Sequence, residues 1–346
     1  MNKLNKKEKI MNNLNKIGVS ALCGTLAAIS AAQAGELTVS GGADLTWISK
    51  SDAVTGNPIG MASAVSFAGS GELDNGWGVA ISIAQGDASA YSNTNITITL
   101  PGLGDVKIQQ GVSGTGIQRY DDITPTVWEE ADGAGIGATI NKIAGTSAGA
   151  TIEITPTEVM PAGLTTHFAW SKDSDSGQAN DKVAGGVSGT LGSGWDMTVE
   201  ASSDLTGVDG LTLYAGMAEV EQYQNSGTHN GDVSEKVYGI KYAAGSFTVG
   251  YQVTEEDNGR TGTTGYDNTT YGITFNVNDD LSIGYNHTES DGKGASADPE
   301  VDSLQAAYTM GGATFSIAEV DVENAGYSTA ATADLNGTVI KLGLAF

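Results

Sequence analysis

The stretch Tyr238–Tyr251, YGIKYAAGSFTVGY, contains two short runs in which every second residue is large and apolar. These residues are Tyr238, Ile240 and Tyr242 in the first run and Phe247, Val249 and Tyr251 in the second. Glycine, lysine or threonine separates them, and small residues around Gly245 join the two runs. Because successive side chains of a strand point to opposite faces, the stretch predicts a β-hairpin with one apolar face and one small or polar face.

The same alternation recurs along most of the chain, with little helical periodicity after the N-terminal segment. The other alternating runs are 37–47, 61–67, 77–83, 96–100, 106–108, 152–154, 164–170, 271–275, 281–285, 304–308, 313–317 and 336–346. Short turns alternate with longer polar loops, and we expect both ends of the sheet at the short-turn rim, which requires an even number of strands. The segment 182–203 leaves two counts open. One long strand there gives sixteen strands, which we favour, and a hairpin at Gly192–Gly194 gives eighteen.

Composition and hydropathy together favour an all-β membrane protein. The chain has 49 glycines, only 6 prolines and a mean hydropathy of −0.13. An antiparallel up-and-down β-barrel with an apolar outside and a wet interior accounts for such a chain. A closed barrel also pairs every backbone polar group in lipid without helices. A β-sandwich, which shares the alternation, is the alternative fold.

The N-terminus resembles a secretory signal peptide over residues 1–34. Five lysines and one glutamate precede an uncharged run at 17–29, and Ala32-Gln-Ala34 has the form of a cleavage site. Met11 is an alternative start. A membrane anchor is the other interpretation, but the run is short for a span of about 20 residues. Residues 35–346 would then be one barrel domain without cysteine and with a formal charge of −29, which argues against nucleic-acid binding.

Several motifs, in their order along the chain, resemble the general porins of Gram-negative outer membranes, and most closely their α-proteobacterial branch. They are Glu36–Gly41 (ELTVSG), Gly69–Gly76 (GSGELDNG), Gly102–Ile108 (GLGDVKI) and the terminal Phe346. The resemblance implies a homotrimer of sixteen-stranded barrels in the outer membrane, in contact with lipid and lipopolysaccharide. It also implies that Phe346 is an assembly signal read by the barrel-assembly machinery. Deleting Phe346 should therefore leave unassembled chain in the periplasm; normal levels of heat-resistant trimer would contradict this.

The resemblance further implies that a long third loop folds into the pore as a constriction. The interruption at 112–148 follows the fifth predicted strand, as such a loop would. Its candidate constriction residues are Arg119, Asp121, Asp122, Glu129, Glu130 and Asp132. A solvated surface loop is the alternative for this acidic segment.

Strand parity predicts which side chains line the pore wall. The candidates are Asp44, Glu72, Lys107, Glu153, His167, Lys241 and Lys341, and Asp196 and Glu200 share the inward parity. In the family, a basic cluster on the wall faces the acidic loop. Gln109 and Gln110 follow Lys107 where the family pattern usually continues with Gly and Arg, so this chain departs from the arginine ladder.

These features predict a passive diffusion channel for small hydrophilic solutes and ions, including cations. Fixed charges act strongly inside a narrow pore, so the excess of acids predicts a modest cation preference. It should weaken when Asp121, Asp122, Glu129 and Glu130 are neutralised. A solute-specific porin, and a non-conducting structural or adhesive surface protein, are the alternative functions.

Other chemistry is sparse in the sequence. The three histidines, His167, His229 and His287, have no partner at a metal-ligand spacing, and no catalytic triad stands out among the many serines. We therefore expect no enzyme activity, cofactor or structural metal. The segment Asp173–Asp181 is rich in oxygen ligands but lacks the final glutamate of an EF-hand, so it allows at most a loosely bound Ca²⁺.

Overall fold

The computed structural model describes residues 34–50, 56–87, 93–110, 113–147, 149–174, 190–222, 231–262 and 265–345. Segment 1–33 with the expected signal peptide, the terminal Phe346 and most of the expected calcium loop lie outside the described residues. No described helix is long and apolar enough to cross a membrane.

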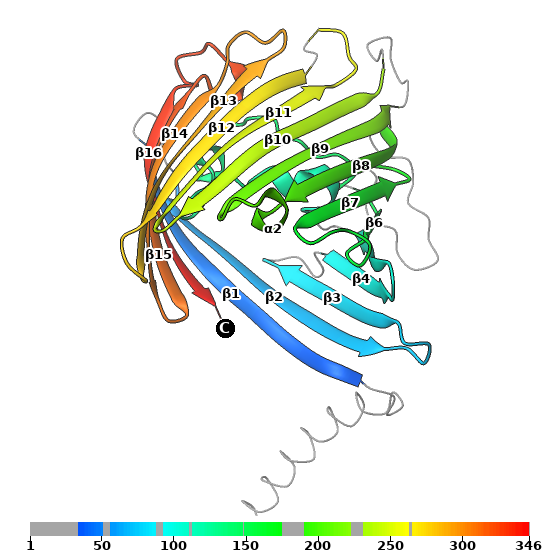
Figure 1. Ribbon diagram of the computed structural model, residues 1–346. Coiled ribbons are helices and arrows are strands. Elements are labelled where there is room, and N and C mark those ends of the chain that lie inside the picture. Colours follow the sequence, from blue (N-terminus) through cyan, green and yellow to red (C-terminus); the bar gives the residue numbers. More distant parts are fainter. Residues whose placement is uncertain are drawn as a thin grey trace, which may run out of the picture.

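Sixteen antiparallel strands form one closed barrel, in which each strand pairs with its neighbours in sequence and β16 closes on β1 (Figure 1). The strands are β1 (Ala34–Lys50), β2 (Ile59–Glu72), β3 (Gly78–Gly86), β4 (Asn93–Leu100), β5 (Gly104–Gln110), β6 (Thr151–Thr155), β7 (Leu164–Ser171), β8 (Leu191–Ala201), β9 (Leu211–Gln222), β10 (Val233–Ala244), β11 (Phe247–Asp257), β12 (Gly265–Asn276), β13 (Leu281–Gly292), β14 (Glu300–Met310), β15 (Ala313–Glu323) and β16 (Leu335–Ala345). The short helix α2 (Ser203–Thr206) lies in the turn between β8 and β9. The short turns gather at one rim of the barrel (Figure 1).

The predicted strand count of sixteen is confirmed, and the alternative of eighteen is wrong. Gly192–Gly194 lies inside β8, where the pairing with β9 shifts register between Leu191 and Gly194 instead of turning back. A register shift lets a glycine-containing segment bend without ending the strand. The N-terminal part of the predicted long strand, 182–189, lies outside the described residues.

The third loop, which the structure describes over residues 113–147 and 149–150, lies inside the barrel, where its teal ribbon is visible between the strands (Figure 1). It contains two short 3-10 helices, η1 (Gly116–Tyr120) and η2 (Ala131–Gly133). Of the two readings of the acidic segment, the structure therefore supports the inserted loop and not the solvated surface loop.

Two apolar clusters seat this loop on the inner wall. In the first, Ala131, Ala134, Ile136 and Ala138 of the loop pack on Val301, Ala318, Val320, Val322 and Val339 of β14–β16. In the second, Ile117, Tyr120 and Ile143 pack on Tyr214, Ala218 and Val237 of β9 and β10. Fully burying a valine or isoleucine typically contributes ~1.5–3 kcal/mol, so these clusters are a substantial part of the energy that keeps the loop inside. The expectation of a uniformly small or polar inner face is wrong beneath the loop.

Candidate pore constriction

Three buried carboxylates of the wall accept hydrogen bonds from backbone N–H groups of the third loop. Glu153 Oε2 on β6 lies 2.9 Å from the nitrogen of Gly116, and Asp196 Oδ2 on β8 lies 3.1 Å from that of Thr146. Glu235 Oε2 on β10 lies 2.7 Å from the nitrogen of Gly145. Glu153 and Asp196 are 3% and 0% exposed. Both were counted among the inward charges by parity, but their carboxylates are covered by the loop that they hold.

Four wall amides continue this set of anchors around the barrel, from β11 to β14. Gln252, Asn268 and Gln305 donate to loop carbonyl oxygens, and Asn286 accepts from the backbone N–H of Ala131 at 2.8 Å. Buried backbone groups that leave water need such partners. The anchors therefore provide hydrogen-bond partners for the backbone of a long irregular segment that forms few backbone–backbone hydrogen bonds of its own.

Glycines on the wall make room for the tip of the loop. Gly250 on β11 and Gly272 on β12 are direct cross-strand partners. A Cβ atom at Gly250 would overlap the Pro125 ring, and one at Gly272 would overlap the Pro125 carbonyl. Neither glycine has a positive φ. Glycine is therefore required at these positions because Pro125 approaches closely, and not because of the backbone conformation.

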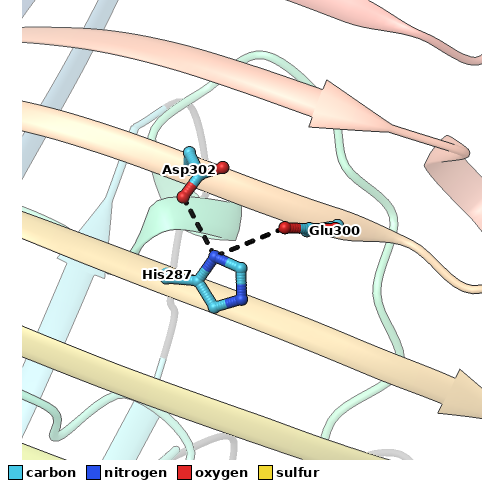
Figure 2. Close-up of side chains that lie close together, drawn as sticks. All are labelled: His287, Glu300 and Asp302. Atoms are coloured by element: carbon cyan, nitrogen blue, oxygen red, sulfur yellow. Dashed lines mark hydrogen bonds and ion pairs between the residues drawn. The ribbon is translucent and has the colours of Figure 1, made fainter.

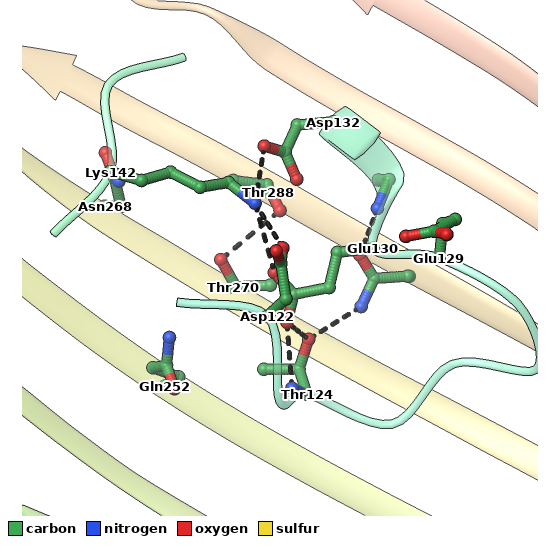
Figure 3. Close-up of polar contacts among 12 residues, drawn as sticks. Asp122, Thr124, Glu129, Glu130, Asp132, Lys142, Gln252, Asn268, Thr270 and Thr288 are labelled. Atoms are coloured by element: carbon green, nitrogen blue, oxygen red, sulfur yellow. Dashed lines mark hydrogen bonds and ion pairs between the residues drawn. The ribbon is translucent and has the colours of Figure 1, made fainter. Parts of the chain in front are cut away.

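A lysine that the sequence analysis did not single out organises the acidic part of the loop. Lys142 Nζ lies 2.9 Å from Asp132 Oδ2 and 3.9 Å from Glu130 Oε2, and it also pairs with Asp122. Figure 3 shows the ammonium group pointing between these carboxylates, against the wall of β11–β13. We call Lys142, Asp122, Glu130 and Asp132 the charge cluster. The backbone N–H and the hydroxyl of Thr124 both donate to Glu130 Oε1.

Burial shifts the titration of this cluster. The pKa of Glu130 is raised to about 8 by burial, with Lys142 and Thr124 acting in the opposite direction. Burial and then Asp122 raise the pKa of Asp121 to about 7. Burial alone would lower the pKa of Lys142, but Asp132, Glu130 and Asp122 raise it above its usual value. The lysine therefore stays charged while the two acids titrate near neutral pH.

A second polar group lies around Glu153. Arg119 of the loop forms an ion pair with Glu153, and Lys107 on β5 is the cross-strand neighbour of Glu153. His167 Nδ1 lies 2.8 Å from Thr155 Oγ1 and 3.8 Å from Glu153 Oε1. Three basic side chains thus lie around the Glu153 carboxylate. Arg119 therefore binds the barrel wall and is not a free charge at the eyelet.

One cavity inside the barrel lies beside Val127 and Trp128 of the third loop. This cavity, of about 630 Å³, separates the two residues from β1, β2, β15 and β16. Small residues form much of its wall, and its charged lining residues are Asp44, Asp87 and Lys341. Lys341 Nζ lies 3.5 Å from Asp44 Oδ2 and 5.5 Å from the centre of the Trp128 ring, within the range of a cation–π contact. We call this space the eyelet cavity.

Glu129 directly follows Trp128, which lines this cavity. Burial raises the pKa of Glu129, and the charge of Lys341 lowers it. Two other predicted wall residues lie away from the cavity lining. Glu72 is exposed at the end of β2, and Lys241 lies half-buried on β10.

The geometry separates the predicted residues into three groups. Asp122, Glu130 and Asp132 meet at Lys142, Arg119 and His167 meet at Glu153, and Asp44 meets Lys341. Sequence reasoning missed Lys142, Trp128, Asp87 and Glu235. The sequence of β15 did indicate where the loop packs. Before Ala318 the apolar residues of this strand point outward, whereas after Ala318 valines point inward and acids point outward.

No protein-family model matches the chain, and a search of curated proteins found no match. Solved structures match it over 90% of its length. A mutant of the Rh. blastica porin aligns with a TM-score of 0.56 at 15% identity, with 100% of that chain covered. The anion-selective porin from Comamonas acidovorans aligns with a TM-score of 0.64 at 14% identity, again with 100% covered.

The chain has a porin fold. At 14–15% identity the likeness establishes the architecture, and it confirms the fold expected from the sequence motifs. Within this porin fold, the seven wall anchors, the charge cluster and the eyelet cavity are features of this chain's own side chains.

Proposed function

We propose that the protein is a passive diffusion channel for small hydrophilic solutes and ions across the outer membrane. The observation that carries the proposal is the eyelet cavity of about 630 Å³, which lies between the wall and a loop anchored inside a closed barrel. A packed interior would leave no such space. The charged and small side chains around it suit hydrated solutes.

Conductance in a planar lipid bilayer tests this function. Purified barrel should insert and give discrete current steps, whereas a structural or adhesive surface protein would insert without them. A matched control is the same preparation after heat denaturation. Insertion without steps, demonstrated by co-flotation with the lipid, would contradict the channel.

We further propose a modest preference for cations. Asp44, Asp87 and Glu129 lie in or beside the eyelet cavity, against Lys341 as the basic residue of its lining. The fold does not decide the sign, since the Comamonas neighbour is named anion-selective. The sign must come from the charges of this chain at the narrow region, where the effective dielectric constant is lower than in water.

Raising the pH should increase this cation preference. Between about pH 6 and about pH 9, Asp121 and Glu130 lose protons, because their pKa values are about 7 and about 8, and the third loop becomes more negative. We expect the reversal potential under a KCl gradient to move towards the cation limit over this range. Glu130→Gln should remove the part of this shift in reversal potential that occurs around pH 8. Asp209 is an exposed turn residue, and Asp209→Asn should leave the whole shift intact. A flat profile in the parent chain would contradict the prediction.

The same protonation has a consequence for stability. Because the folded pKa of Glu130 is raised above its ordinary value of 4.5, the folded chain binds more protons than the unfolded chain between about pH 4.5 and about pH 8. The contribution of Glu130 to the free energy of unfolding therefore falls as the pH rises through this window.

Export and assembly complete the proposal. We propose that residues 1–34 are removed on export, that the barrel lies in the outer membrane as a homotrimer and that it has no enzyme activity. The support is the porin fold together with the wide outward band of exposed apolar residues such as Ile240, Phe247 and Tyr251. N-terminal sequencing of outer-membrane material and electrophoresis of unheated samples test cleavage and trimer formation.

A further inference from the structure

The outer wall of the barrel changes from apolar to acidic along β13–β15. On β15 the outward residues Phe315 and Ile317 are followed by Glu319, Asp321 and Glu323, all exposed. Carboxylates face each other directly across the strands, and these pairs are Glu289 with Glu300, Glu300 with Glu323, and Asp302 with Asp321. Like charges directly opposite each other destabilise a sheet. The arrangement therefore calls for a positive charge at this position.

One imidazole lies among these acids. His287 Nδ1 on β13 lies 2.9 Å from Asp302 Oδ1 and 3.9 Å from Glu300 Oε1, and all three groups point into the same space (Figure 2). Their possible ligand atoms all lie within 4.8 Å of one another. For His287 this contradicts the expectation that the histidines have no partners, because β13 and β14 pair in register and the loop between them hides that pairing in the sequence. His229 lies outside the described residues.

The histidine is held in place by its surroundings. The residue is only 8% exposed, and its ring stacks on Tyr271 with the centroids 4.7 Å apart. The hydroxyl of Tyr285 donates to Asp302 Oδ1, which orients that carboxylate. A hydrogen bond from a neighbouring side chain to a ligating carboxylate is a common support of metal sites.

Basic side chains do not account for the acids. Among the described residues, His287 is the only ion-pair partner of Glu300 and Asp302. A protonated His287 would add a single charge against five carboxylates at Glu289, Glu300, Asp302, Asp321 and Glu323. A divalent cation offers twice the charge and can bind carboxylates of both β14 and β15.

We propose that His287, Glu300 and Asp302 bind a divalent metal ion on the outer wall, with Zn²⁺ as the representative ion. A tetrahedral Zn²⁺ with metal–ligand distances near 2.1 Å separates its ligand atoms by about 3.4 Å. The observed separations of 2.9 Å and 3.9 Å lie on either side of this value, so small side-chain rotations suffice. The imidazole nitrogen favours Zn²⁺ over Ca²⁺ and Mg²⁺, which prefer oxygen ligands. Glu323 and Asp321 lie on the next strand, where they can complete the coordination.

Calorimetric titration of chelator-treated barrel in detergent with ZnCl2 tests the site, independently of any channel activity. We expect one high-affinity Zn²⁺ per chain. His287→Asn and Asp302→Asn should each weaken binding by at least about 100-fold, and Tyr285→Phe, which removes only the supporting hydrogen bond, by about 10-fold. His167→Asn on the inner wall and Glu255→Gln on β11 are the matched controls and should leave binding unchanged.

The proposal would be overturned by a parent chain that binds no stoichiometric Zn²⁺. It would also be overturned by binding that survives His287→Asn. Equal binding of Ca²⁺ and Zn²⁺, insensitive to His287, would show a carboxylate surface without a metal site and would equally contradict it. Should a variant fail to fold, the visible spectrum of Co²⁺ bound to the parent chain decides. Intense tetrahedral bands with an imidazole ligand support the site, and weak octahedral bands contradict it.

Discussion

Replacing Lys142 with methionine should loosen the third loop and lower the free energy of unfolding in urea by about 3 kcal/mol. The reason is that Asp132, with a side chain only 7% exposed, would lose its ammonium partner while staying buried. Removing one member of a buried ion pair typically costs about 3–5 kcal/mol, and the half-exposed Asp122 places this case at the lower end. In a bilayer, the loosened loop should appear as larger and noisier current steps.

The controls for this change are available within the chain. Lys142→Met combined with Asp132→Asn should recover part of the stability, because the uncompensated buried carboxylate of Asp132 is gone. Lys172→Met, at an exposed lysine after β7, should change neither quantity. If Lys142→Met left both the stability and the current steps unchanged, the charge cluster would have no part in holding the loop.

Neutralising the acids of the eyelet cavity should reverse the ion preference. The variant Asp44→Asn, Asp87→Asn and Glu129→Gln removes the acids in or beside the cavity and leaves Lys341 without its ion-pair partner. The remaining charge of the cavity lining is then positive, so we expect the reversal potential at about 0.1 M salt to change sign. The effect should shrink at about 1 M salt, where the screening length falls to about 3 Å.

The charge cluster supplies a matched comparison. The pair Asp122→Asn and Glu130→Gln also removes acids from the third loop, but it exposes the charge of Lys142 against the wall and away from the cavity lining. We therefore expect a smaller shift in selectivity than the eyelet variant gives, although the sequence alone suggested all the loop acids as equivalent. A larger shift from the cluster variant would place the filter at Lys142.

The sequence predicted the fold well because a barrel strand is a local pattern. Tyr238, Ile240 and Tyr242 lie outward and Lys241 inward, as their alternation requires. The length of the segment after β5 predicted a long loop there, and the resemblance to porins implied that this loop folds into the pore. Charges were harder to predict, since parity gives the face of a side chain and says nothing of what covers it. Glu153 and Asp196 point inward as expected, yet the loop buries both.

The sequence by itself determined the alternation, the closed all-β architecture and the position of the long loop, because these follow from neighbouring residues and from the need to pair backbone groups in lipid. The tertiary structure alone decided which charges meet. Lys341 and Asp44 are 297 positions apart, and His287 reaches Asp302 only through the register of β13 and β14. Such contacts depend on barrel closure, strand register and the path of the third loop, which is selected by the apolar seat and the anchors around the wall. These are long-range packing terms that no local pattern encodes.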